Sequence, residues 1–174
     1  MIDIQLIYPL DPKTDTSIER LAHELKNAGF NLDGVPNGYD KRFLSSDKNT
    51  RVDVDYIGDV KRFRYFESTE RNGFDPQKLL AIAIRSKELV EKLFPAVKYS
   101  DGVMMGIASS NRDITDLYND KTNSAIKEFG RKLFGNPLFK ELKVDMHCID
   151  ITIYENSSYL DNNKPSISYP LTPV

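Results

Sequence analysis

The stretch RVDVDYIGDVKRFRYF, residues 51–66, decides the fold, because two alternating segments flank a Gly-Asp pair that is typical of a tight hairpin turn. With this pair as the turn, Asp53 lies opposite Arg64 and Asp55 lies opposite Arg62, while valines face aromatic residues on the other side. The sequence therefore predicts a hairpin with one apolar face and one face of exposed ion pairs. Reversing both charges of one pair should be nearly silent, since exposed pairs contribute about 0–1 kcal/mol.

Further helices and strands are predicted on both sides of the hairpin. Residues 2–8 alternate as a strand, and residues 16–28 carry a helical apolar stripe that ends before a glycine. A helix from 76 to 94 begins with an Asp-Pro pair and ends before Pro95. Beyond it, the pattern predicts a buried strand at 103–108, a helical region at 114–133 that breaks near 119–120, and a long strand at 143–155.

The order of these elements predicts an α+β protein with a mainly antiparallel or mixed sheet and about three helices. The first six elements match the β-α-β-β-α-β order of a ferredoxin-like unit, and a further helix and a long strand follow them. We expect residues 1–155 to form a single α+β domain. Residues 156–174 are polar and rich in proline, which predicts an extended C-terminal tail.

Two segments depart from simple patterns. Residues 31–50 are dense in turn-forming residues and predict a long surface loop with one short strand at most. In residues 143–155, Val144 and Cys148 alternate in one phase, whereas Ile149 begins an alternation in the opposite phase. One strand cannot bury both sets on the same face unless a residue is inserted, so we predict a β-bulge near Cys148.

Composition narrows the classes of function. The 174 residues are 40% hydrophobic and 29% charged, as in globular proteins, and the net charge of −2 lacks the basic field of proteins that bind phosphates. Nucleic acid is therefore not the expected partner. The chain has neither a signal peptide nor an apolar run of about 18 residues, so we expect a cytoplasmic protein without membrane contact. The single cysteine and the absence of zinc-ligand spacing predict no metal and no cofactor.

Two groups of carboxylates invite a catalytic interpretation. Asp53 and Asp55 share one strand face, as metal-binding carboxylates do, but the arginines opposite them favour ion pairs. The bulge predicted above would bring Asp145, His147 and Asp150 to one polar face, where they could bind a metal or act as a positioned base. An acid-base or metal-assisted enzyme is therefore an alternative, although no second histidine lies nearby. No P-loop or nucleophile motif occurs in the chain.

A nucleic-acid accessory protein is the second alternative. Residues 61–66 interleave basic and aromatic residues, which suits a single-stranded nucleic acid. Strand alternation sends Phe63 and Tyr65 to one face and Arg62 and Arg64 to the other. The rings and cations named here would then not share a surface, which weakens this alternative.

These observations favour a non-catalytic protein that binds another protein, such as an immunity protein or an inhibitor of a host or rival enzyme. The composition, rich in Asn, Lys, Ile and Tyr and without Trp, resembles that of proteins from low-GC bacteria or their phages. The candidate contact residues are types favoured at interfaces and lie in the 31–50 segment and in the tail. They are Tyr39, Arg42, Phe43, Tyr159, Tyr169 and Leu171. Alternation at the tail's end further predicts that residues 166–169 lie along a sheet edge or a groove.

Overall fold

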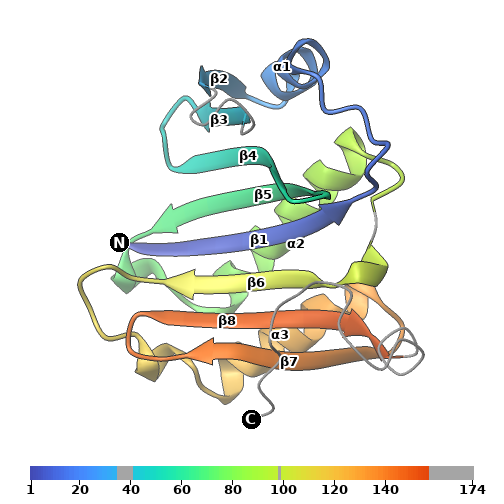
Figure 1. Ribbon diagram of the computed structural model, residues 1–174. Helices are drawn as coiled ribbons and strands as arrows, with labels where there is room; N and C mark the ends of the chain where they lie inside the picture. The colour runs from blue at the N-terminus through green and yellow to red at the C-terminus, as the bar shows by residue number, and fades with distance from the viewer. Residues whose placement is uncertain (35–40, 98, 157–174) are drawn as a thin grey trace.

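The computed structural model describes residues 1–34, 41–97 and 99–156 (Figure 1). Its strands form one eight-stranded sheet in the order β2-β3-β4-β5-β1-β6-β8-β7, in which every neighbouring pair is antiparallel. The strands are β1 (Ile2–Leu10), β2 (Phe30–Gly34), β3 (Lys41–Ser45), β4 (Thr50–Ile57), β5 (Val60–Thr69), β6 (Val103–Ala108), β7 (Pro137–Val144) and β8 (Cys148–Glu155). The predicted α+β class with a mainly antiparallel sheet is confirmed.

Three α-helices accompany the sheet in the part of the chain that the structure describes. They are α1 (Ile18–Asn27), α2 (Pro76–Leu93) and α3 (Asp120–Leu133), with short 3₁₀ turns η1 (Arg71–Gly73), η2 (Tyr99–Asp101) and η3 (Thr115–Leu117). Helices α2 and α3 lie behind the sheet in Figure 1, whereas α1 lies beside β2 at one end. We call the sheet face opposite α2 and α3 the open face. None of the described helices is both long and apolar enough to cross a bilayer.

The core lies between the sheet and the helices. Alternate residues of β1, such as Ile4 and Leu6, are fully buried on the helix side, together with Phe63 of β5 and Leu79 of α2. The predicted cap is present at the start of α2, where the side chain of Asp75 accepts a hydrogen bond from the backbone N–H of Lys78 and Pro76 begins the helix. The remaining residues of each strand point to the open face, since successive side chains alternate.

The predicted hairpin register is confirmed. Asp53 lies opposite Arg64, and Asp55 lies opposite Arg62, around a turn in which Gly58 has a φ of 57°. Glycine suits this turn because that backbone conformation is costly for other residues. The predicted ion pair between Asp53 and Arg64 does not form, because Arg64 binds Asp55 instead. The predicted exposure is also wrong, since Asp53 is 2% exposed and Asp55 is 3% exposed.

The ferredoxin-like arrangement is not confirmed. Strands β4, β5, β1 and β6 are neighbours in this order and all pair antiparallel, which agrees with such a unit. Helix α1, however, packs beside β2 at one end of the sheet, and strands β2 and β3 are inserted between α1 and β4. The second half of the predicted unit therefore agrees with the structure better than the first.

The segment predicted as a long loop contains two strands. Strand β2 pairs with β3, and β3 pairs with β4, so this segment extends the sheet at its edge. Each strand has five residues, and buried Phe30 and Phe43 each supply one large core side chain. An apolar pattern this short cannot be recognised among turn-forming residues. The two strands were therefore predicted as a loop. Residues 35–40 lie outside the described residues.

The long strand predicted at 143–155 is a hairpin. Strands β7 and β8 are joined by a turn at residues 145–147 and pair antiparallel. The side chain of Asp145 caps this turn, because its Oδ1 accepts hydrogen bonds of 2.8 Å from the backbone N–H groups of His147 and Cys148. The change of phase therefore arises from a chain reversal, and the predicted bulge near Cys148 is wrong. An irregularity in the ladder lies instead in β7, between Glu141 and Lys143.

Candidate functional site

Four arginines from three neighbouring strands surround two buried carboxylates on the open face. Asp53 accepts two hydrogen bonds of 3.1 Å from Arg42. Asp55 accepts two hydrogen bonds of 2.9 Å from Arg62 and a third of 2.9 Å from Arg64. These bidentate contacts hold the guanidinium groups in fixed orientations. We call this group the arginine cluster; its members are Arg42, Arg51, Asp53, Asp55, Arg62 and Arg64.

Arg51 is held differently from the other members. Its Nε lies 3.4 Å from Oδ2 of Asp53, but the guanidinium donates no hydrogen bond to any described residue. It stacks on Phe66 instead, with its Cζ 3.9 Å from the ring centroid, and Arg64 also lies over this ring at 4.9 Å. The side chain is 34% exposed. Arg51 is therefore oriented by stacking and by its ion pair with Asp53, and its buried Nε has no hydrogen-bond partner among the described residues.

The electrostatic surroundings of Arg51 are unfavourable to its charge. Burial lowers the pKa of Arg51 from its usual value, and the positive charges of Arg42 and Arg64 lower this pKa further. The attraction of Asp53 opposes these effects without cancelling them. An additional anion near Arg51 would relieve this repulsion.

A groove of about 490 Å³ begins at Arg51 and crosses the open face. Its floor follows one cross-strand row, in which Arg51 pairs with Phe66, Phe66 with Gln5, Gln5 with Gly106, and Gly106 with Asp150. Gly106 keeps the floor low, because a Cβ atom at this position would lie 2.7 Å from Oδ1 of Asp150. The other lining residues are Asp3, Leu44, Lys48, Asn49, Ser68, Met104, Ala108 and Cys148.

The three residues proposed for an acid-base or metal site do not converge. Asp145 is exposed, caps the β7–β8 turn and pairs with Lys143 at 3.3 Å. His147 is exposed in that turn, whereas Asp150 lies half-buried in the groove. Among the described residues, no group of three His, Cys, Asp or Glu side chains is placed to hold a metal ion.

Asp150 and Cys148 form a hydrogen-bonded pair on the groove wall. The Cys148 thiol donates to Oδ2 of Asp150 at 3.1 Å. Burial raises the pKa of Asp150 above its usual value, and the nearby charge of Asp145 adds to this effect. Burial, the hydrogen bond to Asp150 and the charge of Asp150 together raise the pKa of Cys148 to about 12. The thiol is therefore a poor nucleophile at neutral pH.

The native Cys148 thiol is expected to react slowly with a disulfide reagent such as DTNB at pH 8, because little thiolate is present. Denaturation should accelerate the reaction toward that of a free cysteine. The variant D150N should also accelerate it in the native state, since one of the negative charges that raise the thiol pKa is then gone. The rate of absorbance change under the three conditions tests this, and rapid labelling of the native wild type would contradict it.

Of the six residues predicted to contact a partner, only Arg42 and Phe43 lie in the part of the chain that the structure describes. Arg42 belongs to the arginine cluster on the open face. Phe43 is fully buried in the core, so a contact with a partner would require the sheet to open at β3. Its neighbours along the strand point to the other face, as alternation requires. Tyr39, Tyr159, Tyr169 and Leu171 lie outside the described residues, as does the segment 166–169.

Phe66 of β5 also lies on the open face and was not among the residues predicted from the sequence. Its position two residues after Arg64 places it on the same face as the arginines, and the alternation used for Phe63 and Tyr65 could have identified it. A ring and several cations therefore do share the open face. The ring is covered by Arg51, however, so this side of Phe66 is not open to a stacking base.

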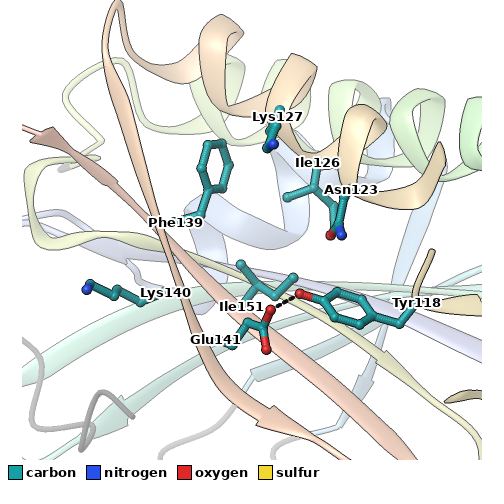
Figure 2. Close-up of a pocket in the computed structure, with 8 residues that line it drawn as sticks. All are labelled: Tyr118, Asn123, Ile126, Lys127, Phe139, Lys140, Glu141 and Ile151. Atoms are coloured by element: carbon teal, nitrogen blue, oxygen red, sulfur yellow. Dashed lines mark hydrogen bonds between the residues drawn. The ribbon is translucent and has the colours of Figure 1, made fainter. Parts of the chain in front are cut away.

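A second cavity, of about 310 Å³, lies between α3 and strand β7 (Figure 2). Helix α3 approaches β7 closely at Gly130, where a Cβ atom would lie 2.6 Å from Phe139. In Figure 2 the Tyr118 hydroxyl donates to Glu141 at one edge of the cavity. Burial and this hydrogen bond raise the pKa of Tyr118, so its hydroxyl stays protonated and cannot act as a base at neutral pH. The remaining lining residues are Asn123, Ile126, Lys127, Lys140 and Ile151.

No family model matches the sequence, and no curated protein is significantly similar to it.

Proposed function

We propose that this chain is a non-catalytic protein that binds another protein through the open face of its sheet, as an immunity protein or an enzyme inhibitor of bacterial or phage type does. The observation that carries the proposal is the state of Arg51. Its side chain is about one-third exposed, and its guanidinium is oriented over Phe66 and donates no hydrogen bond to any described residue. A partner carboxylate could accept two parallel hydrogen bonds from such a group.

The composition of this face supports a protein partner. Arginine and aromatic residues are enriched at protein interfaces and among the residues that dominate binding energy. Four arginines and Phe66 lie on three adjacent strands, and the buried carboxylates of Asp53 and Asp55 limit the arginines' movement. Little side-chain entropy would then be lost when a partner binds.

The two alternatives have less support. An acid-base or metal-assisted enzyme needs Asp145, His147 and Asp150 at one place, and these side chains are dispersed. A nucleic-acid accessory protein needs free ring faces and few carboxylates, whereas Asp3 and Asp150 line the groove. A single cysteine suits a reducing compartment, so we propose that binding takes place in the cytoplasm.

Affinity capture from lysate of the native cell tests the proposal through three forms of the protein. These are the wild type, R51A on the open face, and R131A on α3, which removes an exposed arginine on the helix side. We expect one protein to be retained by the wild type and by R131A, and to be lost with R51A. Loss of a central arginine contact should weaken binding by about 2 kcal/mol or more.

Two outcomes would contradict the proposal. Retention of the same proteins by the wild type and R51A would remove the open face from the interaction. Capture that nuclease treatment abolishes would favour the nucleic-acid alternative. Thermal melting of all three forms establishes that R51A is folded under the capture conditions.

A further inference from the structure

We infer that the groove beside the arginine cluster binds an extended segment of the partner that carries a carboxylate at one end, held by Arg51. The inference rests on the proposed function and adds to it the chemistry and the conformation of the bound part of the partner. It is carried by three features of the groove: its length, its division into a cationic and an acidic end, and its low floor.

The length of the groove suits a short extended segment. The row from Arg51 to Asp150 crosses strands β4, β5, β1, β6 and β8 in consecutive order. At about 4.8 Å between neighbouring strands, the row spans about 19 Å, which is the length of about six extended residues. The row is straight because each of its members is the direct cross-strand partner of the next.

The cationic end combines Arg51 with Lys48. Lys48 lies in the turn between β3 and β4 and has a φ of 60°, a conformation that this turn fixes. Its backbone N–H donates to the carbonyl oxygen of Ser45 at 3.0 Å, and Oδ1 of Asp47 accepts hydrogen bonds from Ser45 Oγ and the Asn49 N–H. The turn therefore fixes the backbone of Lys48, a second cationic residue that lines the groove. Two cationic residues in one groove favour a carboxylate.

The acidic end is formed by Asp150 on β8, whereas Asp3 lies on β1, midway along the row, where its charge also attracts Arg51. Oδ2 of Asp150 accepts from the Cys148 thiol, whereas Oδ1 accepts no hydrogen bond from any described residue. Ser68 donates to Oδ1 of Asp3 at 2.5 Å. Oδ1 of Asp150 can accept a hydrogen bond from a backbone N–H group or from a lysine ammonium of the bound segment.

This division of charge decides between an acidic peptide and a nucleic acid. A nucleic-acid strand carries a phosphate at every nucleotide, so a strand along the groove would place phosphates beside Asp3 and Asp150. A peptide can carry a carboxylate near Arg51 and only N–H donors or a basic residue near Asp150. The peptide therefore matches both ends of the groove, and the nucleic acid matches one.

The low floor leaves room for a main chain. Gly106 stands in the middle of the row, and neighbouring Ala108 is also small. A larger side chain at position 106 would displace the carboxylate of Asp150 and fill the groove without touching the arginine cluster. The variant G106V, which also has a high strand propensity, therefore separates occupation of the groove from the charge of Arg51.

Selection from a displayed library of random peptides about eight residues long tests the inference. The library is selected on the intact wild-type protein and counter-selected on R51A, and an enriched peptide is then titrated as a synthetic probe. We expect aspartate or glutamate to accumulate at one end of the enriched peptides. R51A and G106V should each weaken binding of the synthetic peptide at least about 10-fold, whereas R131A should leave it unchanged.

Several results would overturn the inference. They are the absence of acidic enrichment, equal binding of the peptide to the wild type and R51A, or tighter binding of a single-stranded oligonucleotide of about six nucleotides than of the peptide. If such a result occurs while capture of the partner still depends on Arg51, the inference that an acidic segment binds in the groove is wrong, and the proposed function stands. If capture is also independent of Arg51, the proposed function fails as well. R51A removes an ion pair with Asp53 and the stacking on Phe66, so its folding is checked by thermal melting. The comparison of R51A with the wild type does not require G106V, so it holds even if G106V does not fold.

Discussion

Replacing Asp55 by alanine is expected to lower the free energy of unfolding by about 3–5 kcal/mol, the loss typical of removing one partner from a buried ion pair. Asp55 is 3% exposed and accepts three hydrogen bonds from Arg62 and Arg64. Without the carboxylate, two guanidinium groups would face each other on the sheet. The Arg62 side chain is only 12% exposed, so water cannot replace the lost acceptor freely.

Urea denaturation of the wild type, D55A and a matched control measures this effect. The control is D59A, which removes an exposed aspartate from the turn of the same hairpin. Its free energy of unfolding should stay within about 0.5 kcal/mol of the wild-type value, as for most surface substitutions. A loss below about 1 kcal/mol for D55A would mean that the pairs behave as exposed ones.

The same geometry changes the expected result of charge reversal. From the sequence, exchanging the charges of Asp55 and Arg62 should be nearly silent, because each aspartate has one opposed arginine. In the structure Asp55 also binds Arg64, so an arginine at position 55 would lie beside a second arginine. The exchange is therefore expected to destabilise the protein. The alternation of the hairpin predicts which residues lie opposite each other. It does not predict how many arginines bind each aspartate, or how deeply the aspartates are buried.

The parts of the fold that the sequence predicts correctly are local. The hairpin at 51–66 and helix α2 are specified by neighbouring residues: a glycine turn in the first case, and an aspartate cap with a following proline in the second. The hairpin at 137–155 was missed because its turn contains neither glycine nor proline. The turn is stabilised instead by the side chain of Asp145, which accepts hydrogen bonds from two backbone N–H groups. These hydrogen bonds form only in the folded turn, so the sequence does not reveal them.

The candidate site depends on contacts that are distant in the sequence. Arg51 and Phe66 belong to one predicted hairpin, but Gln5, Gly106 and Asp150 come from three other parts of the chain. Their alignment follows from the strand order and the register of every pair, which no local pattern contains. The sequence therefore predicts one ion pair of the arginine cluster correctly, Asp55–Arg62, but neither the partners of Asp53 nor the groove beside the cluster.

Replacing Phe43 by alanine is expected to lower the free energy of unfolding by about 3–5 kcal/mol, as large-to-small substitutions of buried aromatic residues do. Phe43 is fully buried on the helix side of β3, opposite Val52 of β4, where it belongs to the hydrophobic core. Its exposed cross-strand neighbour Leu32 provides the matched control, because Leu32 is 45% exposed. The variant L32A should lose about 1 kcal/mol or less, since little apolar surface is removed from the core.

The two roles considered for Phe43 are separated by measuring stability and binding together. A core residue changes the melting temperature of the protein, whereas a contact residue changes partner capture at a temperature where the variant is folded. We expect F43A to melt at a lower temperature and, well below that temperature, to retain the partner as the wild type does. Stable F43A that no longer captures the partner would place Phe43 in the interface. It would then follow that β2 and β3, at one end of the sheet, open on binding, because Phe43 has no exposed surface in the folded chain.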